Sequence, residues 1–427
     1  MTIHLSTVVT SRNDNHGGTL TYRMQKFIDF YLYQCNKFRI KHELIIVEWN
    51  PPDDKKSLYS ELKWPKNNKF CDIRIITVPK KIHMKFSNSK FLPLYQMIAK
   101  NVGIRRAKGK YILATNIDII ISNECFKYIN NKLNDDALYR VNRYDIPGEL
   151  PEKKMEDILN WCKHNIIRVN YTYGIINFKN LNFFEKKLFF SSNKIFYLIN
   201  EIKKIVAFNV KSFIKNILDL EIEAFNVKSF IKNILDLEIN LKKQPKKRII
   251  LSFRIFLKAI FIFLFIKKAL TIILKSFFKF LKLFYIYPKN IIYSSINLIK
   301  FIFTRQATNA CGDFTLLSKK NWFELQGYLE LPYYSFHIDS VLLHKAKHFK
   351  IKEKFIGIDK FIYHIEHSIG SGFTPEGSET LFSRLDKKSI PYLTNEDLAD
   401  YETQKKIIPD NIDWGLAKYN LPEKSFK

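Results

Sequence analysis

One short stretch combines an apolar strand with a single charge. Lys108–Ser122 reads KGKYILATNIDIIIS, and Asp118 is its only carboxylate. A charge at the end of a buried strand costs free energy unless a partner compensates it. Because Arg105 and Arg106 precede the strand, the pattern suits a divalent metal that bridges a diphosphate. The alternative is that Asp118 caps the N-terminus of a following helix.

A second group of chemically active side chains lies later in the chain, in SFHIDSVLLHKA and FIYHIEHSIGSGFTPEG. The chain has only ten histidines, so their concentration here is notable. Asp339 precedes an apolar helical run, and its ordinary role would be to cap that helix. The histidines could equally be structural. The group consists of His337, Asp339, His364, Glu366 and His367.

Two polar loops follow apolar segments near the N-terminus. In TSRNDN, short polar side chains and an arginine suit a diphosphate or a nucleoside, although the loop could simply cap the next helix. In VEWNPP, Glu48 and Asn50 could hydrogen-bond a base or a ribose, or could belong to a solvated strand end. The first loop contains Thr10, Ser11, Arg12 and Asn13.

Hydrophobic periodicity predicts the elements that must position these residues. Strand, helix, strand, strand, helix, strand in that order indicates an α/β sandwich with a largely parallel sheet. Ligands of such sheets gather at the carboxyl ends of the strands. The polar loops and Asp118 all follow predicted strands. The strands are Ile3–Thr10, His42–Asn50, Cys71–Pro79 and Lys110–Asp118, and the helices are Leu20–Phe38 and Leu92–Ala107.

The composition narrows the class of protein. The chain has 427 residues, is 46% hydrophobic and carries a formal net charge of +29. That charge predicts attraction to nucleic acid, anionic lipid or phosphorylated substrates. Five scattered cysteines without a CxxC pair favour a reducing compartment, and the N-terminus lacks a secretory signal pattern. Without GxxxxGK[ST], GxGxxG after the first strand or GxSxG, kinases, Rossmann dehydrogenases and α/β hydrolases are disfavoured.

The segment 171–305 has a different composition. Ala207–Ile222 recurs unchanged at Ala224–Ile239, and two copies indicate a recent duplication rather than a solenoid. Between Glu238 and Asp313 there are 15 basic residues, no acidic ones and only short uncharged apolar runs. These runs are too short to span a bilayer, so we expect a helix on an anionic membrane surface or a helical insert packed on the protein. The large apolar surface argues against nucleic acid.

Two segments resemble a known family. NVGIRRAKGKYILATNID resembles the N-x-G-x-x-x-A-x-G-x-(Y/F)-(I/L)-x-x-x-D-x-D segment of family-2-like glycosyltransferases with the GT-A fold. ACGDFTLLSKKNWFELQGYLELPYYSFHID resembles their later segment, in which an acidic residue opens a helix. The resemblance implies a GT-A-type, Rossmann-like α/β/α sandwich with a mostly parallel central sheet, interrupted by the basic helical insertion. Its expected parts are a nucleotide-sugar-binding half at 1–170, the insertion at 171–305, an acceptor and metal half at 306–375 and a helical tail at 376–427.

The resemblance also implies roles for individual residues. Asp118 would bind a divalent cation, Mn²⁺ or Mg²⁺, and His364 would complete that metal site. Asn116 takes the place of the family's first aspartate and removes one negative charge. Asp339 matches the base that deprotonates the acceptor. The expected donor-binding residues are Thr10, Ser11, Arg12, Asn13, Glu48, Asn101, Arg105, Asn116 and Asp118.

The sequence thus predicts a metal-dependent glycosyltransferase that moves a sugar from a nucleotide-sugar donor to a glycan or lipid-linked acceptor, as in surface polysaccharide or glycoconjugate synthesis. We expect it to be cytoplasmic and peripheral on the inner face of the membrane. One alternative is a sugar nucleotidyltransferase, although the glycine- and arginine-rich loop of such enzymes is missing after the first strand. The other is a non-catalytic membrane-associated scaffold that keeps the fold.

Overall fold

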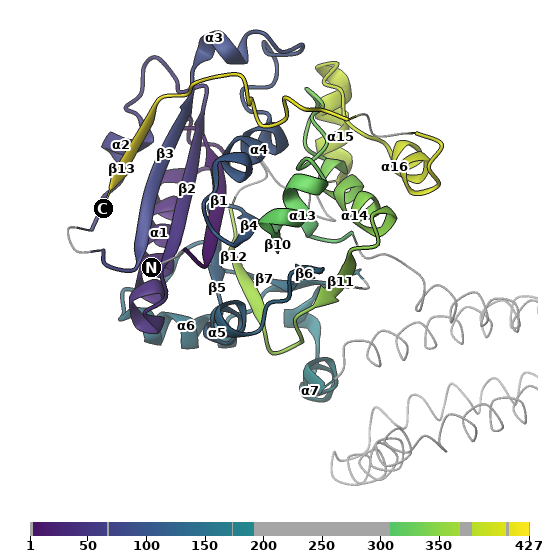
Figure 1. Ribbon diagram of the computed structural model, residues 1–427. Helices are drawn as coiled ribbons and strands as arrows, with labels where there is room; N and C mark the ends of the chain where they lie inside the picture. The colour runs from purple at the N-terminus through teal and green to yellow at the C-terminus, as the bar shows by residue number, and fades with distance from the viewer. Residues whose placement is uncertain are drawn as a thin grey trace, which may run out of the picture. The chain divides into compact units, whose positions relative to one another are not determined.

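The computed structural model describes residues 3–65, 68–172, 174–191, 308–367, 378–406 and 410–426. They belong to one compact unit made of Met1–Leu198 and Gln306–Lys427 (Figure 1). The tandem repeat and the expected membrane helix lie outside the described residues, and the division into four parts stays a prediction. Within the described ranges, no helix is both long and apolar enough to cross a membrane.

An eight-stranded sheet forms the centre of this unit, in the order β11-β6-β10-β4-β1-β2-β3-β13. All of its strands except β10 and β13 run in the same direction. This is the mostly parallel sheet that the sequence predicts. The strands are β1 (Leu5–Ser11), β2 (His42–Trp49), β3 (Cys71–Val78), β4 (Tyr111–Thr115), β6 (Ala137–Arg140), β10 (Phe314–Ser318), β11 (Lys352–Phe355) and β13 (Glu423–Phe426).

Helices cover both faces of this sheet and complete an α/β/α sandwich. Successive strand residues point to opposite faces, so Val8 joins one hydrophobic cluster while Leu5 and Val9 join another. The first cluster includes residues of α4 (Gln96–Arg106), α13 (Lys319–Glu324), α14 (Ile338–His348) and α15 (Ser378–Lys387). The second includes residues of α1 (Leu20–Phe38) and α5 (Asn123–Asn131).

A second, five-stranded sheet lies beside the first and was not expected from the sequence pattern. The chain passes from β4 to β5 through Asn116, Ile117 and Asp118, so these residues lie where the two sheets meet. The strands, in spatial order, are β5 (Ile119–Ile121), β12 (Phe361–Ile365), β7 (Asn142–Ile146), β8 (Arg168–Tyr171) and β9 (Gly174–Asn177). The remaining elements are α2 (Leu58–Glu61), α3 (Lys80–His83), α6 (Met155–His164), α7 (Phe183–Ser191), α16 (Asn395–Glu402) and two 3-10 turns, Phe178–Asn180 and Cys311–Asp313.

The segment 376–427, expected to be a helical tail, is only partly helical. It contains α15 and α16 but ends in β13, which pairs antiparallel with the outer edge of β3. The unpaired backbone groups of an edge strand favour such an addition, and a segment as short as EKSF carries too little pattern to reveal it. Arg106 anchors the tail by donating hydrogen bonds to the carbonyl oxygens of Gly415, Leu416 and Tyr419. All five cysteines are buried and free.

A buried histidine makes the stability of the fold sensitive to acid. His42 on β2 lies within 3.0 Å of the Tyr31 hydroxyl and within 2.7 Å of Asn130 Oδ1. Burial lowers the pKa of His42 to about 4. Between pH 6.5 and about 4 the unfolded chain therefore binds a proton that the folded chain does not, which removes up to about 3 kcal/mol of stability as the pH falls.

We predict that His42→Gln abolishes this part of the acid destabilisation. Urea unfolding of the full chain at pH 7 and pH 4.5 should show a smaller loss of unfolding free energy in the variant than in the wild type. His164→Gln, which changes an exposed histidine on α6, serves as the control and should behave like the wild type. Equal losses in His42→Gln and the wild type would contradict the prediction.

Candidate active site

Asp118 is buried at the junction of the two sheets, with 6% of its surface exposed. Its Oδ2 accepts a hydrogen bond of 2.8 Å from the guanidinium of Arg23 on α1. The same oxygen lies 3.4 Å from Nε2 of His367 and 3.8 Å from Nε2 of His364. Asp118 is not a helix cap, because Ser122 caps α5 with its side chain. The carboxylate of Asp118 therefore has one arginine and two histidines around it.

A row of paired side chains crosses the second sheet behind Asp118. Strand register places His364 beside Asp145 and Asp145 beside Arg168. Nδ1 of His364 lies 3.2 Å from Oδ1 of Asp145, while Arg143 and Arg168 contact the two oxygens of Asp145 at 2.8 and 2.7 Å. Asp145 is fully buried, so its charge is compensated entirely by these neighbours. The pairing turns Nε2 of His364 toward Asp118.

The charges in this group keep both aspartates ionised. Burial raises the pKa of Asp118, but His364, His367 and Arg23 outweigh it and hold the pKa well below its usual range. Burial likewise raises the pKa of Asp145, and Arg143, His364 and Arg168 reverse that shift. For His364, burial and Arg143 lower the pKa, yet Asp118 and Asp145 raise it further, so the net shift is upward.

Asp118, His364 and His367 form a donor set that fits a divalent cation. Each offers one ligand atom, and these atoms lie within 4.8 Å of one another. Separations of 3.4 and 3.8 Å can be bridged by one ion with bonds of about 2.1 Å. Oδ1 of Asp118 is buried and has no hydrogen-bond partner among the described residues, so it is available to a cation.

A second triad, Asp145, His364 and Glu366, fits a metal less well. Its atoms also lie within 4.8 Å of one another. However, Asp145 already contacts two guanidinium groups, and Glu366 forms an ion pair with Arg168. A cation at this place would have to displace arginines from a buried carboxylate, which is costly. We therefore assign this triad to positioning His364.

Asn116 faces a carboxylate that the sequence analysis missed. Its Nδ2 donates a hydrogen bond of 2.6 Å to Oδ1 of Asp313, and its Oδ1 accepts one of 3.0 Å from Gln96. Arg143 holds the other oxygen of Asp313 at 2.7 Å. An aspartate at position 116 would place two carboxylates in contact here, which is unfavourable unless a proton or cation is shared. The amide of Asn116 removes this repulsion, and Asp313 keeps a negative charge next to it.

Asp339 lies next to Gly312. It is the second residue of α14 and half-buried; His337 is the N-cap, so Asp339 is not the cap that its sequence context suggested. A Cβ on Gly312 would come within 2.6 Å of Oδ2 of Asp339, so any other residue at position 312 would displace this carboxylate. The ammonium group of Lys100 donates a hydrogen bond of 2.7 Å to the carbonyl oxygen of Gly312.

Lys100 is a buried charge that connects the two carboxylate regions. It is fully buried on α4, and burial lowers its pKa to about 8. The charges of Asp313, Asp339 and Asp118 act against this lowering, in that order of strength. β10 begins opposite the end of β4, so Asp339, beside Gly312, and Asp118, after β4, lie at the same edge of the sheet.

The predicted nucleoside loops are held mainly by their own contacts. Thr10 donates to the carbonyl of Val47, and Asn13 donates to that of Lys56. Arg12 donates to the carbonyl of Asn50 at 2.6 Å and pairs with Asp14 at 3.0 Å. These contacts use the hydroxyl donor of Thr10, one of the two amide N–H groups of Asn13 and two of the five N–H groups of Arg12. The alternative interpretation of TSRNDN, a turn that caps the following helix, has support, because Asn15, the last residue of this stretch, accepts a hydrogen bond of 3.2 Å from the N–H of Leu20 at the start of α1.

Glu48 and Ser11 keep polar atoms that the structure does not use. Oε1 of Glu48 accepts a hydrogen bond of 2.7 Å from the N–H of Leu58, and burial raises the pKa of Glu48 despite this bond. Oε2 of Glu48 and Oγ of Ser11 are buried and lack a hydrogen-bond partner within the described ranges. Both atoms therefore remain available to a ligand.

Asn101 and Arg105 contact other segments of the fold rather than the residues around Asp118, contrary to the expectation that they bind the donor. Asn101 is fully buried, donates to the carbonyl of Tyr328 and accepts from its N–H. Arg105 lies over the ring of Trp414 and donates to its carbonyl. The reason is that α4 carries Asn101 toward the loop after α13 and Arg105 toward the C-terminal segment. Nothing in the sequence of α4 alone could show that this segment returns to it.

Comparison with known proteins leaves the site to be interpreted from its own geometry. Neither a protein-family model nor a curated protein matches this sequence. Similar solved structures include S. aureus TarS residues 1–349 (TM-score 0.24, 13% identity, 35% of this chain and 39% of that chain) and S. aureus TarS (0.23, 12%, 35% and 23%). Another is GalNAc-T7 with UDP, GalNAc and Mn²⁺ (0.34, 9%, 98% and 54%).

TarS and GalNAc-T7 are both glycosyltransferases. The chain spans about half the length of the GalNAc-T7 structure and less of the TarS structures. Because every TM-score is below 0.5 and every identity below 25%, these likenesses carry no argument about this chain.

We predict that Asp145→Asn lowers the affinity for Mn²⁺ by about 10–100-fold, because His364 loses the carboxylate that orients it. Isothermal titration calorimetry with Mn²⁺, together with electron paramagnetic resonance of the free ion, measures this directly. Asp72→Asn, which changes a carboxylate on β3 that pairs with Lys41, is the control and should keep wild-type affinity. An unchanged dissociation constant in a folded Asp145→Asn variant would contradict the positioning role.

Proposed function

We propose that this chain is a metal-dependent glycosyltransferase, similar to family 2, that moves a sugar from a nucleotide-sugar donor to a hydroxyl of a glycan or lipid-linked acceptor. The observation that carries the proposal is the meeting of Asp118, His364 and His367 at the sheet junction, with the carboxylate of Asp339 on the same edge. A cation site and a separate base are the two groups that this reaction needs.

The metal triad would act on the leaving group. A cation bound there would neutralise the diphosphate as the bond to the anomeric carbon breaks. Asp118 contributes the negative charge of the site, and Asp145 fixes the ring of His364. Two imidazole ligands favour a transition metal over Mg²⁺, which prefers oxygen ligands. Of the two cations expected from the sequence, Mn²⁺ is the better match.

Asp339 would act on the acceptor. Its carboxylate would take the proton of the attacking hydroxyl while the oxygen forms the new glycosidic bond and the nucleoside diphosphate leaves. The backbone N–H of Ser340 donates to Oδ1 of Asp339, which leaves Oδ2, the oxygen beside Gly312, for the proton. Glu48 and Ser11 would contribute their unused oxygen atoms to binding of the nucleoside.

The test compares Asp118→Asn and Asp339→Asn with an exposed control, Asp136→Asn. With a panel of nucleotide sugars and Mn²⁺, Asp339→Asn should slow transfer by about 10²–10⁴-fold while the nucleotide still binds. Added Mn²⁺ should no longer increase the transfer activity of Asp118→Asn, and Asp136→Asn should match the wild type. Release of a nucleoside diphosphate supports transfer, whereas release of pyrophosphate would indicate a nucleotidyltransferase. Wild-type activity in both site variants would disprove the assignment.

We further propose that the chain works at the inner face of a membrane, in polysaccharide or glycoconjugate synthesis. The support is the composition of 239–312, with 15 basic residues and no acidic ones. A surface patch gains about 1 kcal/mol per basic residue near an anionic bilayer. The full chain should therefore sediment with vesicles that contain phosphatidylglycerol and much less with pure phosphatidylcholine, and high salt should release it. Equal sedimentation with both kinds of vesicle, or none, would contradict this proposal.

A further inference from the structure

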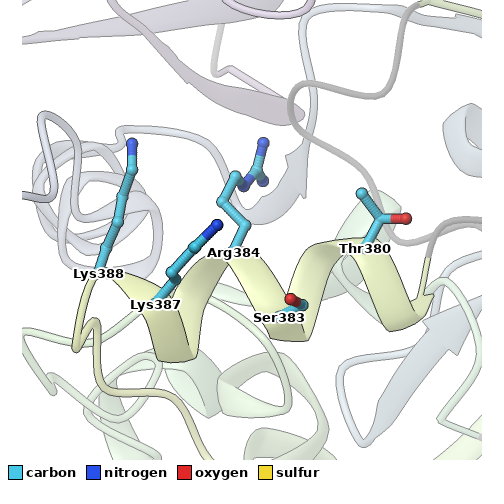
Figure 2. Close-up of a pocket in the computed structure, with 5 residues that line it drawn as sticks. All are labelled: Thr380, Ser383, Arg384, Lys387 and Lys388. Carbon is cyan, nitrogen blue, oxygen red and sulfur yellow. The ribbon is translucent and has the colours of Figure 1, made fainter.

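Helix α15 presents a basic face that the proposed chemistry does not yet use. Thr380, Ser383, Arg384, Lys387 and Lys388 line one open hollow of about 590 Å³. They lie three and four positions apart, which places them on one side of the helix, and the close-up shows their side chains along it (Figure 2). Leu381 and Leu385, on the other side, are buried in the core and fix the orientation of the helix.

The hollow combines three positive side chains with two hydroxyl groups. No carboxylate is among the residues that line it. Lys387 and Lys388 are exposed, and Arg384 is half-buried. Asp386, an acidic residue of the same helix, accepts a hydrogen bond from Tyr392. Arginine, lysine and hydroxyl donors together are the groups that bind phosphate esters.

Ring packing places α15 beside the start of α14, the helix that carries Asp339. The ring of Phe382 on α15 lies edge-on to that of Phe336, which comes just before α14, with ring centroids 5.0 Å apart. Leu385 of α15 and Ile338 of α14 also belong to one buried cluster. A ligand held by α15 would therefore be bound to a helix that packs beside the one that carries the candidate base.

We propose that the α15 face binds a phosphate group carried by one of the two substrates, and this inference rests on the proposed function. Three cations would hold a phosphate monoester or diester tightly enough to orient the molecule that bears it, and the hydroxyls of Thr380 and Ser383 would complete its hydrogen bonds. The phosphate comes either from the diphosphate of the donor or from a phosphorylated acceptor.

The test reverses charge at two positions, in Lys387→Glu/Lys388→Glu. Isothermal titration calorimetry on the full chain uses three probes: inorganic pyrophosphate without metal, a panel of nucleoside diphosphates with Mn²⁺, and glycerol 1-phosphate. We expect the affinity for pyrophosphate to fall by at least about tenfold, and the salt dependence of binding to weaken. Loss that extends only to the nucleoside diphosphates places the donor on α15, and loss that extends only to glycerol 1-phosphate places a phosphorylated acceptor there.

Two further variants separate this site from general effects of charge. Lys127→Glu/Lys132→Glu makes the same change at exposed lysines on and beside α5, on the other face of the sheet, and should leave all affinities unchanged. Lys387→Arg/Lys388→Arg keeps the charge and should bind like the wild type. Unchanged affinity for all three probes in the folded charge-reversal variant would overturn the inference.

The outcome is distinguishable from failure of the proposed function. Pyrophosphate binding without metal does not depend on Asp118, so Asp118→Asn should retain it. If the charge reversal weakens pyrophosphate binding although no nucleotide sugar is bound or turned over, the α15 site stands and the glycosyltransferase proposal fails. If transfer depends on Asp118 and Asp339 but all three probes bind the charge-reversed chain normally, the glycosyltransferase proposal stands and the α15 inference fails.

Discussion

The burial of the Asp118 carboxylate is the constraint on which the site depends. An ionised group that is 6% exposed is stable only if opposite charge lies next to it. One helix supplies Arg23, and the segment that ends β12 supplies two imidazoles. Because Ile365 donates its N–H to the carbonyl oxygen of Asp118, the backbone holds β12 in the register that this charge requires. The ionic contacts and the junction of the sheets therefore stabilise each other.

Charge compensation by neighbouring segments also explains why one carboxylate in the stretch ATNID can suffice for a cation site. With Asp313 only 2.6 Å from the amide of Asn116, the negative charge that the family pattern would place at position 116 is present on a neighbouring strand segment. Arg143 then links Asp313 to Asp145, so the two aspartates share one guanidinium. The charge balance of the site is a property of three segments distant in sequence rather than of the D-x-D position alone.

Periodicity in the sequence predicted local structure well and the surroundings of the charges poorly. The predicted helix Leu20–Phe38 matches α1 at both ends, and the predicted strands coincide with β1 to β4 to within three residues at each end. The resemblance to GT-A glycosyltransferases, rather than periodicity, implied that Asp118 and His364 lie together, and Nε2 of His364 is 3.8 Å from Oδ2 of Asp118.

Arg143, Asp145 and Arg168 escaped notice because alternating polar residues, as in VNRYDI, are typical of a strand with one solvated face. Only the pairing of β7 with β12 and β8 buries them. Arg23 was missed for a related reason, since a charge within an amphipathic helix is normally read as solvent-facing.

The position of the basic segment follows from where these pairings lie. On its N-terminal side the chain supplies β4, β5 and β7, and on its C-terminal side it supplies β10 and β12. β10 pairs with β4, and β12 pairs with both β5 and β7, so neither sheet is complete without residues from both sides. Such pairings between distant segments require a long loop to close, which costs conformational entropy. That cost rises only slowly with loop length. A long insertion between α7 and Cys311 is therefore compatible with the site, provided that both flanks keep the strand register that brings His364 to Asp118.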